Sequence, residues 1–206
     1  MTREEVETFQ RCISVGGVAL FPADTVYGLA TEPDSREGVD RLYRLKGRAA
    51  DAPAAVMFFD LGLALAALPE LGARTREAVG RLLPGALTLL LPNPARRFPL
   101  ACGRAGPDQE RLGLRVPVLE GALAPLSAVS WPVLQSSANR SGGADAARVA
   151  DVDEELRAGV DLILDGGELP GTPSTVVDLT SYEQDGSWEV VREGAVPREA
   201  MVRCLR

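Results

Sequence analysis

The chain has 206 residues, 46% of them hydrophobic, which is enough to build one domain over residues 1–206 with a substantial core. Its formal net charge of −7 disfavours direct nucleic-acid binding, because proteins that bind a phosphate backbone are usually basic. The absence of histidine excludes His metal sites and histidine-dependent nucleophiles. We find neither an apolar run long enough for a membrane span nor a signal-peptide pattern, and we therefore expect a cytoplasmic protein.

Apolar periodicity and turn residues predict the elements of the amino-terminal half. A capping box of Thr2 and Glu5 opens the first helix, which Gly16 and Gly17 end. A strand over residues 18–21 is expected to stop at Pro22. There follow a helix capped by Ser35, a strand over 56–59, helices over 61–68 and 75–83, and a strand over 87–91.

The second half begins with a long segment of no clear period. Residues 92–110 carry Arg96, Arg97 and Arg104, which predicts a mobile surface flap near a binding cavity. The elements expected after it are strands over 112–116, 133–136 and 162–164, helices over 120–127 and 153–158, paired strands over 175–179 and 188–192 around a turn at 184–186, and a helix opened by Pro197. The irregular alternation of strands and helices favours a mixed α/β sheet.

Five stretches place small polar or cationic residues where a strand or helix ends, as ligand-binding α/β sheets do. They are residues 22–29 with Thr25, Lys46-Gly47-Arg48, residues 112–117 with Arg115, residues 136–143 with Ser137 and Asn139, and residues 173–178 with Ser174. Each also has an ordinary structural explanation, such as cations at a helix C-terminus or hydroxyls in a tight turn. No GxxxxGK[ST] loop and no GxGxxG fingerprint occurs, which excludes a P-loop enzyme and a dinucleotide-binding Rossmann domain.

Lys46 is the only lysine among 22 basic residues. Chance can leave one lysine, but a compact ammonium among so many guanidinium groups also indicates a specific task. In contrast, Cys12, Cys102 and Cys204 are far apart, show no metal-ligand spacing and are expected to be reduced thiols.

The order of the motifs resembles that of the YrdC-like family over about residues 15–195. The motifs are Ala23-Asp24-Thr25-Val26-Tyr27-Gly28-Leu29, Lys46-Gly47-Arg48, Pro84-Gly85-Ala86-Leu87-Thr88, Leu114-Arg115-Val116-Pro117, Ser137-Ala138-Asn139-Arg140-Ser141-Gly142, Asp165-Gly166-Gly167, Ser174-Thr175-Val176-Val177-Asp178 and Arg192-Glu193-Gly194. The resemblance implies a twisted mixed α/β sheet around a large cationic cavity.

The resemblance also implies an activity. Members of the family condense L-threonine, bicarbonate and ATP to threonylcarbamoyl-AMP and pyrophosphate, as L-threonylcarbamoyladenylate synthases. ATP would be a substrate, Mg²⁺ would be held largely by its phosphates with no protein metal site, and downstream tRNA-modifying enzymes would use the product.

Site residues follow from the same resemblance and are expected to share one cavity. The catalytic and triphosphate contacts correspond to Lys46 and Arg48, the other nucleotide contacts to Ser137, Asn139 and Arg192, and the threonine contacts to Thr25, Arg115 and Ser174, with Arg115 facing the carboxylate.

Four positions depart from the family pattern. Members commonly have Thr at the position of Ala23, Asn at that of Ala52, His at that of Met57 and a Thr-type residue at that of Arg111. Ala52 and Arg111 are expected on the nucleotide side and Met57 on the threonine side. Two alternatives therefore stay open: a paralogue that binds nucleotide but uses another acceptor, and an RNA-binding module, which the net charge opposes.

Overall fold

The structure, a computed structural model, describes residues 1–103 and 109–205. Its strands, in chain order, are β1 (Ala19–Ala23), β2 (Val26–Thr31), β3 (Ala55–Met57), β4 (Leu87–Pro92), β5 (Arg111–Arg115), β6 (Val133–Ser137), β7 (Leu162–Ile163), β8 (Thr175–Asp178) and β9 (Glu189–Arg192). These described strands form one nine-stranded sheet in the order β7-β1-β2-β6-β3-β5-β4-β8-β9. Pairs β1–β7, β3–β5 and β4–β8 are parallel and the others antiparallel, so the expected mixed sheet is confirmed.

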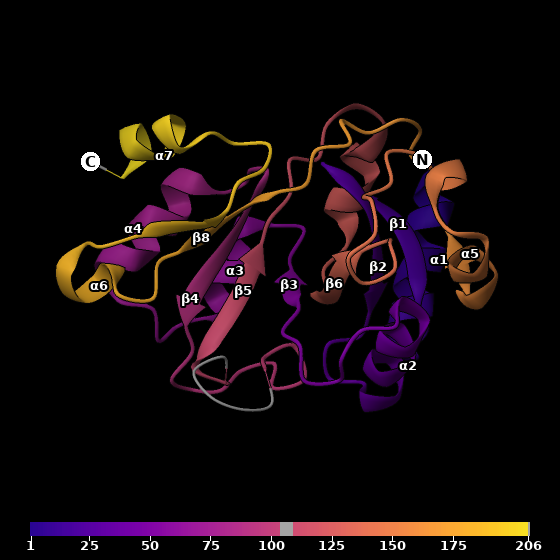
Figure 1. The fold of residues 1–206 in the computed structure, drawn as a ribbon, viewed down its shortest axis with the longest axis horizontal. Helices are drawn as coiled ribbons and strands as arrows, with labels where there is room; N and C mark the ends of the chain where they lie inside the picture. The colour runs from indigo at the N-terminus through magenta and orange to yellow at the C-terminus, as the bar shows by residue number, and fades with distance from the viewer. Residues whose placement is uncertain (104–108, 206) are drawn as a thin grey trace.

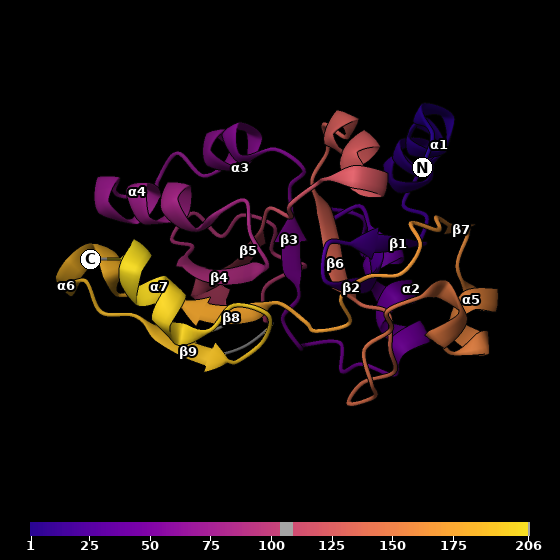
Figure 2. The same ribbon diagram turned by 90° about the horizontal axis from the view of Figure 1, so that it is seen from above.

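Helices surround this sheet. They are α1 (Arg3–Ser14), α2 (Arg36–Lys46), α3 (Leu61–Ala67), α4 (Ala73–Leu82), α5 (Glu154–Gly159), α6 (Tyr182–Asp185) and α7 (Arg198–Cys204), with 3₁₀ helices over Gly121–Ala128 and Val149–Asp151. Figure 1 shows α1, α2 and α5 around β1 and β2, and α4, α6 and α7 around β4 and β8 at the other end of the sheet. Seen from above in Figure 2, α1, α3 and α4 lie on one side of the sheet. Every helix in the described part of the chain is too short or too polar to cross a bilayer.

Helix α1 shows how the local sequence determines its element. The Thr2 hydroxyl accepts a hydrogen bond from Glu5 N, the Glu5 carboxylate accepts one from Thr2 N, and the predicted capping box is confirmed. The apolar face of the helix is fully buried, and Phe9 packs against Phe21 and Phe59 with ring centroids 5.4 and 6.1 Å apart. This aromatic cluster anchors α1 to the β1 end of the sheet.

The expectation that Pro22 stops the first strand is wrong. Strand β1 continues to Ala23, with Pro22 opposite Tyr27 of β2, a strand that the sequence pattern did not predict. Tyr27 directs its backbone groups elsewhere, since its N–H donates to the Ala146 carbonyl and its carbonyl accepts from Ala138 N. The ladder therefore needs no N–H at position 22, and proline is tolerated there.

Other differences are smaller and have local causes. The predicted helix over residues 120–127 is a 3₁₀ helix, because Pro125 within it removes a backbone donor. The predicted turn at 184–186 is the end of α6, which stops at Gly186 with a left-handed φ of 76°. Pro197 is the cap residue of α7 instead of its first helical residue. Of the segment over residues 92–110, Arg104 lies outside the described residues.

Candidate active site

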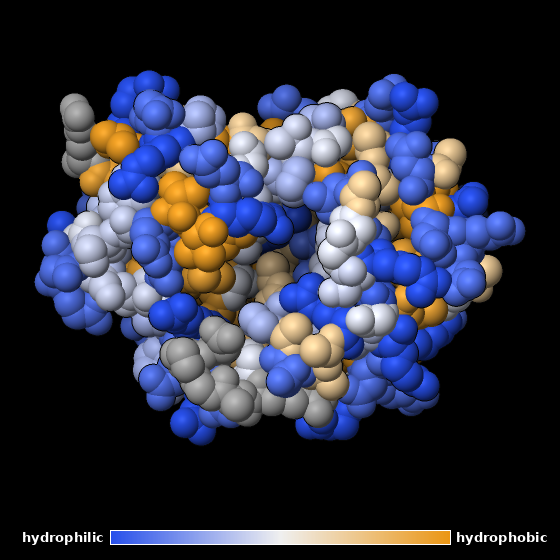
Figure 3. All heavy atoms as spheres, in the orientation of Figure 1, coloured by the Kyte–Doolittle hydropathy of each residue, from blue (hydrophilic) through white to orange (hydrophobic). Residues whose placement is uncertain are grey.

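A cavity of about 220 Å³ lies at the middle of the sheet, and the molecular surface is hollowed there between its two halves (Figure 3). Its walls carry four guanidinium groups, several hydroxyls and one carboxylate among the described residues. The charged and hydroxyl-bearing lining residues are Arg48, Arg111, Arg115, Arg192, Thr88, Ser136, Ser137, Ser174 and Asp145. Clustered arginines and hydroxyls of this kind favour an anionic ligand such as a phosphate or a carboxylate.

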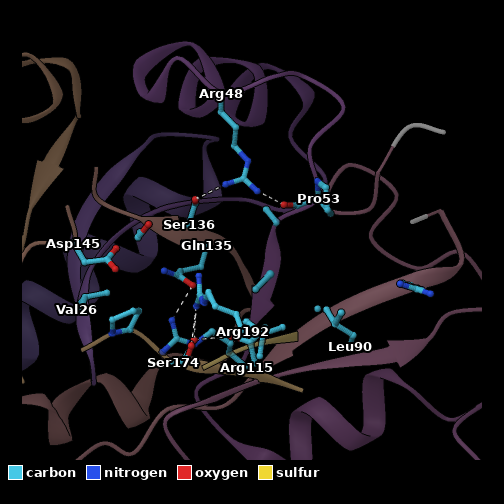
Figure 4. A pocket seen from close by; sticks show the side chains of 18 residues that line it. Val26, Arg48, Pro53, Leu90, Arg115, Gln135, Ser136, Asp145, Ser174 and Arg192 are labelled. Atoms are coloured by element: carbon cyan, nitrogen blue, oxygen red, sulfur yellow. Dashed lines mark hydrogen bonds between the residues drawn. The ribbon is translucent and has the colours of Figure 1, made fainter. Parts of the chain in front are cut away.

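Arg48 reaches the cavity because α2 ends just before it. Gly47 adopts a left-handed φ of 60°, which ends the helix after Lys46 and turns the chain towards β6. Arg48 Nη1 donates to the Ser136 hydroxyl at 3.2 Å and Nη2 to the Pro53 carbonyl, whereas its buried Nε has no partner in the described part of the chain (Figure 4). A guanidinium with an unused donor on a cavity wall is suited to bind an incoming anion.

Lys46 lies behind the cavity wall and does not line the cavity. Its side chain is 2% exposed, and its ammonium donates to the Ser137 carbonyl, to the Asn139 carbonyl at 2.7 Å and to Asn139 Oδ1 at 3.0 Å. Burial, reinforced by the neighbouring Arg48, lowers the pKa of Lys46 to about 8. The structure thus brings Lys46 to the predicted Ser137–Asn139 loop, where it holds the loop in place. Asn139 likewise lies behind the wall.

Arg115 is buried at the end of β5 and pairs with Asp24. Its Nη2 donates to Asp24 Oδ1 at 2.8 Å and to the Thr25 hydroxyl at 3.2 Å, and its Nη1 donates to Gln135 Oε1 at 3.1 Å. Burial raises the pKa of Asp24, although Arg115 and the backbone N–H of Val118 act in the opposite direction. Arg115 Nε is buried without a partner among the described residues, so one donor remains for a ligand. Thr25 supports Arg115 from behind the cavity lining.

Ser174 and Arg192 form the neighbouring part of the wall. Arg192 Nη2 donates to the Ser174 carbonyl at 2.8 Å, and the Ser174 hydroxyl is 2.8 Å from that of Thr88. Gly194 is required for this approach, because a Cβ there would lie 2.3 Å from the Pro173 carbonyl oxygen. Figure 4 shows Arg115, Arg192 and Ser174 gathered on the side of the cavity opposite Arg48. Burial lowers the pKa of Arg115 and the Arg192 charge lowers it further, whereas Asp24 raises it; a bound anion would relieve the repulsion between the two guanidinium groups.

Sequence reasoning missed Asp24, Gln135, Asp145 and Thr88 as site residues. Only Asp24 had a usable signal, since a buried arginine requires a nearby anion. The others depend on the order of strands in the sheet, which the local pattern does not reveal.

The family departures fall in two different environments. Met57 and Ala23 are buried in the apolar cluster that contains Phe21 and Phe59, so the expected place of Met57 in the cavity is not observed. Ala52 also does not line the cavity. Arg111 does line the cavity, at the far end of β5 from Arg115 and on the same strand face. Among the described residues there is no group of three or more His, Cys, Asp or Glu side chains that could hold a metal ion.

The comparisons with known proteins concern the family and the fold of this chain. The Sua5/YciO/YrdC family model, described as "Telomere recombination", matches residues 11–194. The threonylcarbamoyl-AMP synthase of Pyrococcus abyssi is 28% identical over 209 residues, covering 98% of this chain and 59% of that protein. The Bacillus subtilis synthase is 30% identical over 184 residues, covering 88% and 51%.

A solved structure of a relative has a similar fold. The crystal structure of P. abyssi Sua5 complexed with L-threonine matches with a TM-score of 0.81 at 25% identity, covering 99% of this chain and 58% of that one. The chain thus spans a little more than half the length of the relatives that it matches.

Proposed function

Because the chain belongs to the Sua5/YciO/YrdC family, we propose that it is a threonylcarbamoyl-AMP synthase, which condenses L-threonine, bicarbonate and ATP and releases pyrophosphate. The observation that carries the proposal is the cavity in which Arg48, Arg115 and Arg192 meet. Relatives with the same domain are named for this activity, and one of them is solved with L-threonine.

The two ends of the cavity suit the two charged substrates. We assign Arg115 and Ser174 to threonine, with Thr25 holding Arg115 from behind, because the buried guanidinium keeps a free Nε for a carboxylate. The Asp24 carboxylate holds that guanidinium in position and partly neutralises it when the site is empty. We assign the nucleotide to the opposite side, with Arg48 and Ser137 as contacts and with Lys46 and Asn139 supporting them from behind the cavity wall. Arg192, which lies beside Ser174, would reach the nucleotide from across the cavity.

The reaction that we propose needs charge neutralisation and alignment more than a protein acid or base. The threonine nitrogen joins the bicarbonate carbon with loss of water. An oxygen of the resulting carbamate attacks the α-phosphorus of ATP while pyrophosphate leaves. Charge builds up on the phosphate oxygens, and fixed guanidinium groups stabilise it. A site without histidine can perform this chemistry.

The product is a mixed anhydride, which reacts readily with nucleophiles and must be consumed by a further acyl-transfer enzyme. We propose that enzymes of tRNA threonylcarbamoyladenosine modification consume it in the cytoplasm, and that Mg²⁺ accompanies the ATP.

Pyrophosphate release tests the proposal. The purified protein is incubated with ATP, Mg²⁺ and bicarbonate, with L-threonine or each other amino acid in turn, and the adenylate is identified by mass spectrometry. We expect release that depends on both threonine and bicarbonate. Release with a different amine would support the alternative of a paralogue, for which the extra cation Arg111 in the cavity is the structural argument. If ATP binds and no amine supports release, the synthase proposal fails.

A further inference from the structure

Asp145 is the one acidic side chain among the described residues that line the cavity. Figure 4 shows its carboxylate directed into the cavity from the wall beside Val26. Four arginines line the same cavity, yet none of the ion pairs in the described part of the chain involves Asp145. Its carboxylate therefore adds negative charge to a site whose other charged groups are all cationic.

The Asn139 side chain holds this carboxylate in place beside Ser137. Asn139 Nδ2 donates to Asp145 Oδ1 at 3.4 Å, and Asn139 Oδ1 accepts from the Ser137 hydroxyl at 2.7 Å. Lys46 donates to the same Asn139 Oδ1 from behind the wall at 3.0 Å. One amide, anchored by a donation of Nδ2 to the Gly143 carbonyl at 2.6 Å, thus contacts a carboxylate and a hydroxyl that both line the cavity, and each of their oxygens keeps unused lone pairs.

Electrostatics indicate what this pair of oxygens would accept. A carboxylate on the wall of a triphosphate cavity repels its ligand unless a cation lies between them. Mg²⁺ prefers oxygen ligands and is usually bound by one or two carboxylates together with phosphate oxygens and water. The described residues contain no group of three or more His, Cys, Asp or Glu side chains that could hold a metal ion by themselves, which fits a cation shared with the nucleotide.

We propose that Asp145 is the protein ligand of the Mg²⁺ that enters with ATP, with the Ser137 hydroxyl as a second oxygen. This inference rests on the proposed nucleotide site and assigns it a metal-binding residue. It changes the sequence-based expectation that the ion is held largely by the phosphates, with no protein metal site. With Mg²⁺ between them, the Asp145 carboxylate and the triphosphate both attract the ion instead of repelling each other. The site therefore selects Mg²⁺·ATP over free ATP.

Calorimetric titration with ATP, with and without Mg²⁺, tests the inference on the wild type and Asp145→Asn. The matched control is Asp34→Asn, which removes an exposed carboxylate outside the cavity. We expect Mg²⁺ to tighten ATP binding in the wild type and control, and this Mg²⁺-dependent factor to fall about ten-fold or more in Asp145→Asn. Without Mg²⁺, Asp145→Asn should bind ATP at least as tightly as the wild type, because the repulsive charge is gone.

Three results would overturn the inference. If Asp145→Asn lost ATP affinity equally with and without Mg²⁺, Asp145 would be an acceptor for a ribose hydroxyl and not a ligand of the ion. If Asp145→Asn bound ATP more tightly in both conditions, Asp145 would only repel the triphosphate. An unchanged Mg²⁺-dependent factor would leave the ion to the phosphates. As a second measurement, the electron paramagnetic resonance spectrum of bound Mn²⁺·ATP should differ between the wild type and Asp145→Asn. If the wild type binds no ATP at all, the proposed function itself fails, which these titrations show separately.

Discussion

Replacing Lys46 by methionine removes the buried ammonium and keeps the length of the side chain. The ammonium holds the loop from Ser137 to Asn139 through three hydrogen bonds, and the Lys46 carbonyl adds a fourth contact from Ser141 N at 2.9 Å. Because Lys46 does not line the cavity, the substitution acts on the loop and only through it on the nucleotide.

Two opposing effects decide the stability of Lys46→Met near neutral pH. The Ser137 and Asn139 carbonyls lose their charged donor, whereas Asn139 Oδ1 keeps the Ser137 hydroxyl. Two unsatisfied carbonyls cost about 4 kcal/mol together. Removing the buried charge returns about 3 kcal/mol, the equivalent of a pKa lowered from 10.5 to about 8. We therefore expect a net loss of only about 1 kcal/mol in the free energy of unfolding, and a loss of ATP affinity of about ten-fold or more from the displaced loop.

The pH dependence gives the sharper test. The folded protein releases the Lys46 proton near pH 8, and the unfolded chain keeps it until about pH 10.5. Unfolding therefore takes up a proton between these values, and the stability contributed by this group rises with pH through the window. Relative to Lys46→Met, the wild type should gain about 3 kcal/mol of unfolding free energy between pH 7 and pH 10.5.

The assay is urea unfolding of both proteins at several pH values, with ATP calorimetry at neutral pH. Arg44→Met is the control, because it removes an exposed cation from the same helix and should change both quantities little. A stability difference between wild type and Lys46→Met that stays flat from pH 7 to 10.5 would refute the buried-charge reasoning. Unchanged ATP affinity in Lys46→Met would refute the role of the loop.

Three further substitutions have defined outcomes. Arg115→Ala leaves Asp24 buried without its partner, so the free energy of unfolding should fall by about 3–5 kcal/mol. Calorimetry should detect no threonine binding by this variant. A stable variant that still binds threonine would contradict the roles of Arg115 as the partner of Asp24 and as a threonine contact. Asp161→Asn removes a carboxylate whose pKa is lowered chiefly by Arg41. This carboxylate contributes about 1 kcal/mol of unfolding free energy above pH 4, and that contribution is lost as the pH falls. In urea titrations at acid pH the variant and the wild type should therefore become equally stable. A difference in stability that persists at pH 2 would contradict this role of the ion pair with Arg41. Arg111→Ala breaks only a loose ion pair and should change stability by less than about 0.5 kcal/mol, while ATP binding weakens several-fold at low salt; an effect that does not shrink as salt is added would argue against a charge contact.

Local sequence determined most elements of this protein and the types of its site residues. The capping box of α1 and the left-handed glycine that ends α2 involve residues within a few positions of one another, so a linear pattern contains them. The same holds for the shared face of Arg111 and Arg115, because side chains alternate along a strand. The mixed α/β class followed from the irregular alternation of such elements.

Only the tertiary structure decided which of these residues meet. Arg115 finds Asp24 across 91 positions of sequence, and Lys46 finds Asn139 across 93, through a strand order that local propensity does not encode. Strand β2 was missed for the same reason, because its stability comes from pairing with β1 and β6 on both sides. Lys46 is a cation at the end of a helix in the sequence, and it becomes a support for the cavity wall only because the chain returns to that helix at Ser137. Long-range pairing and burial, which no short window contains, turned these cations and polar groups into a site.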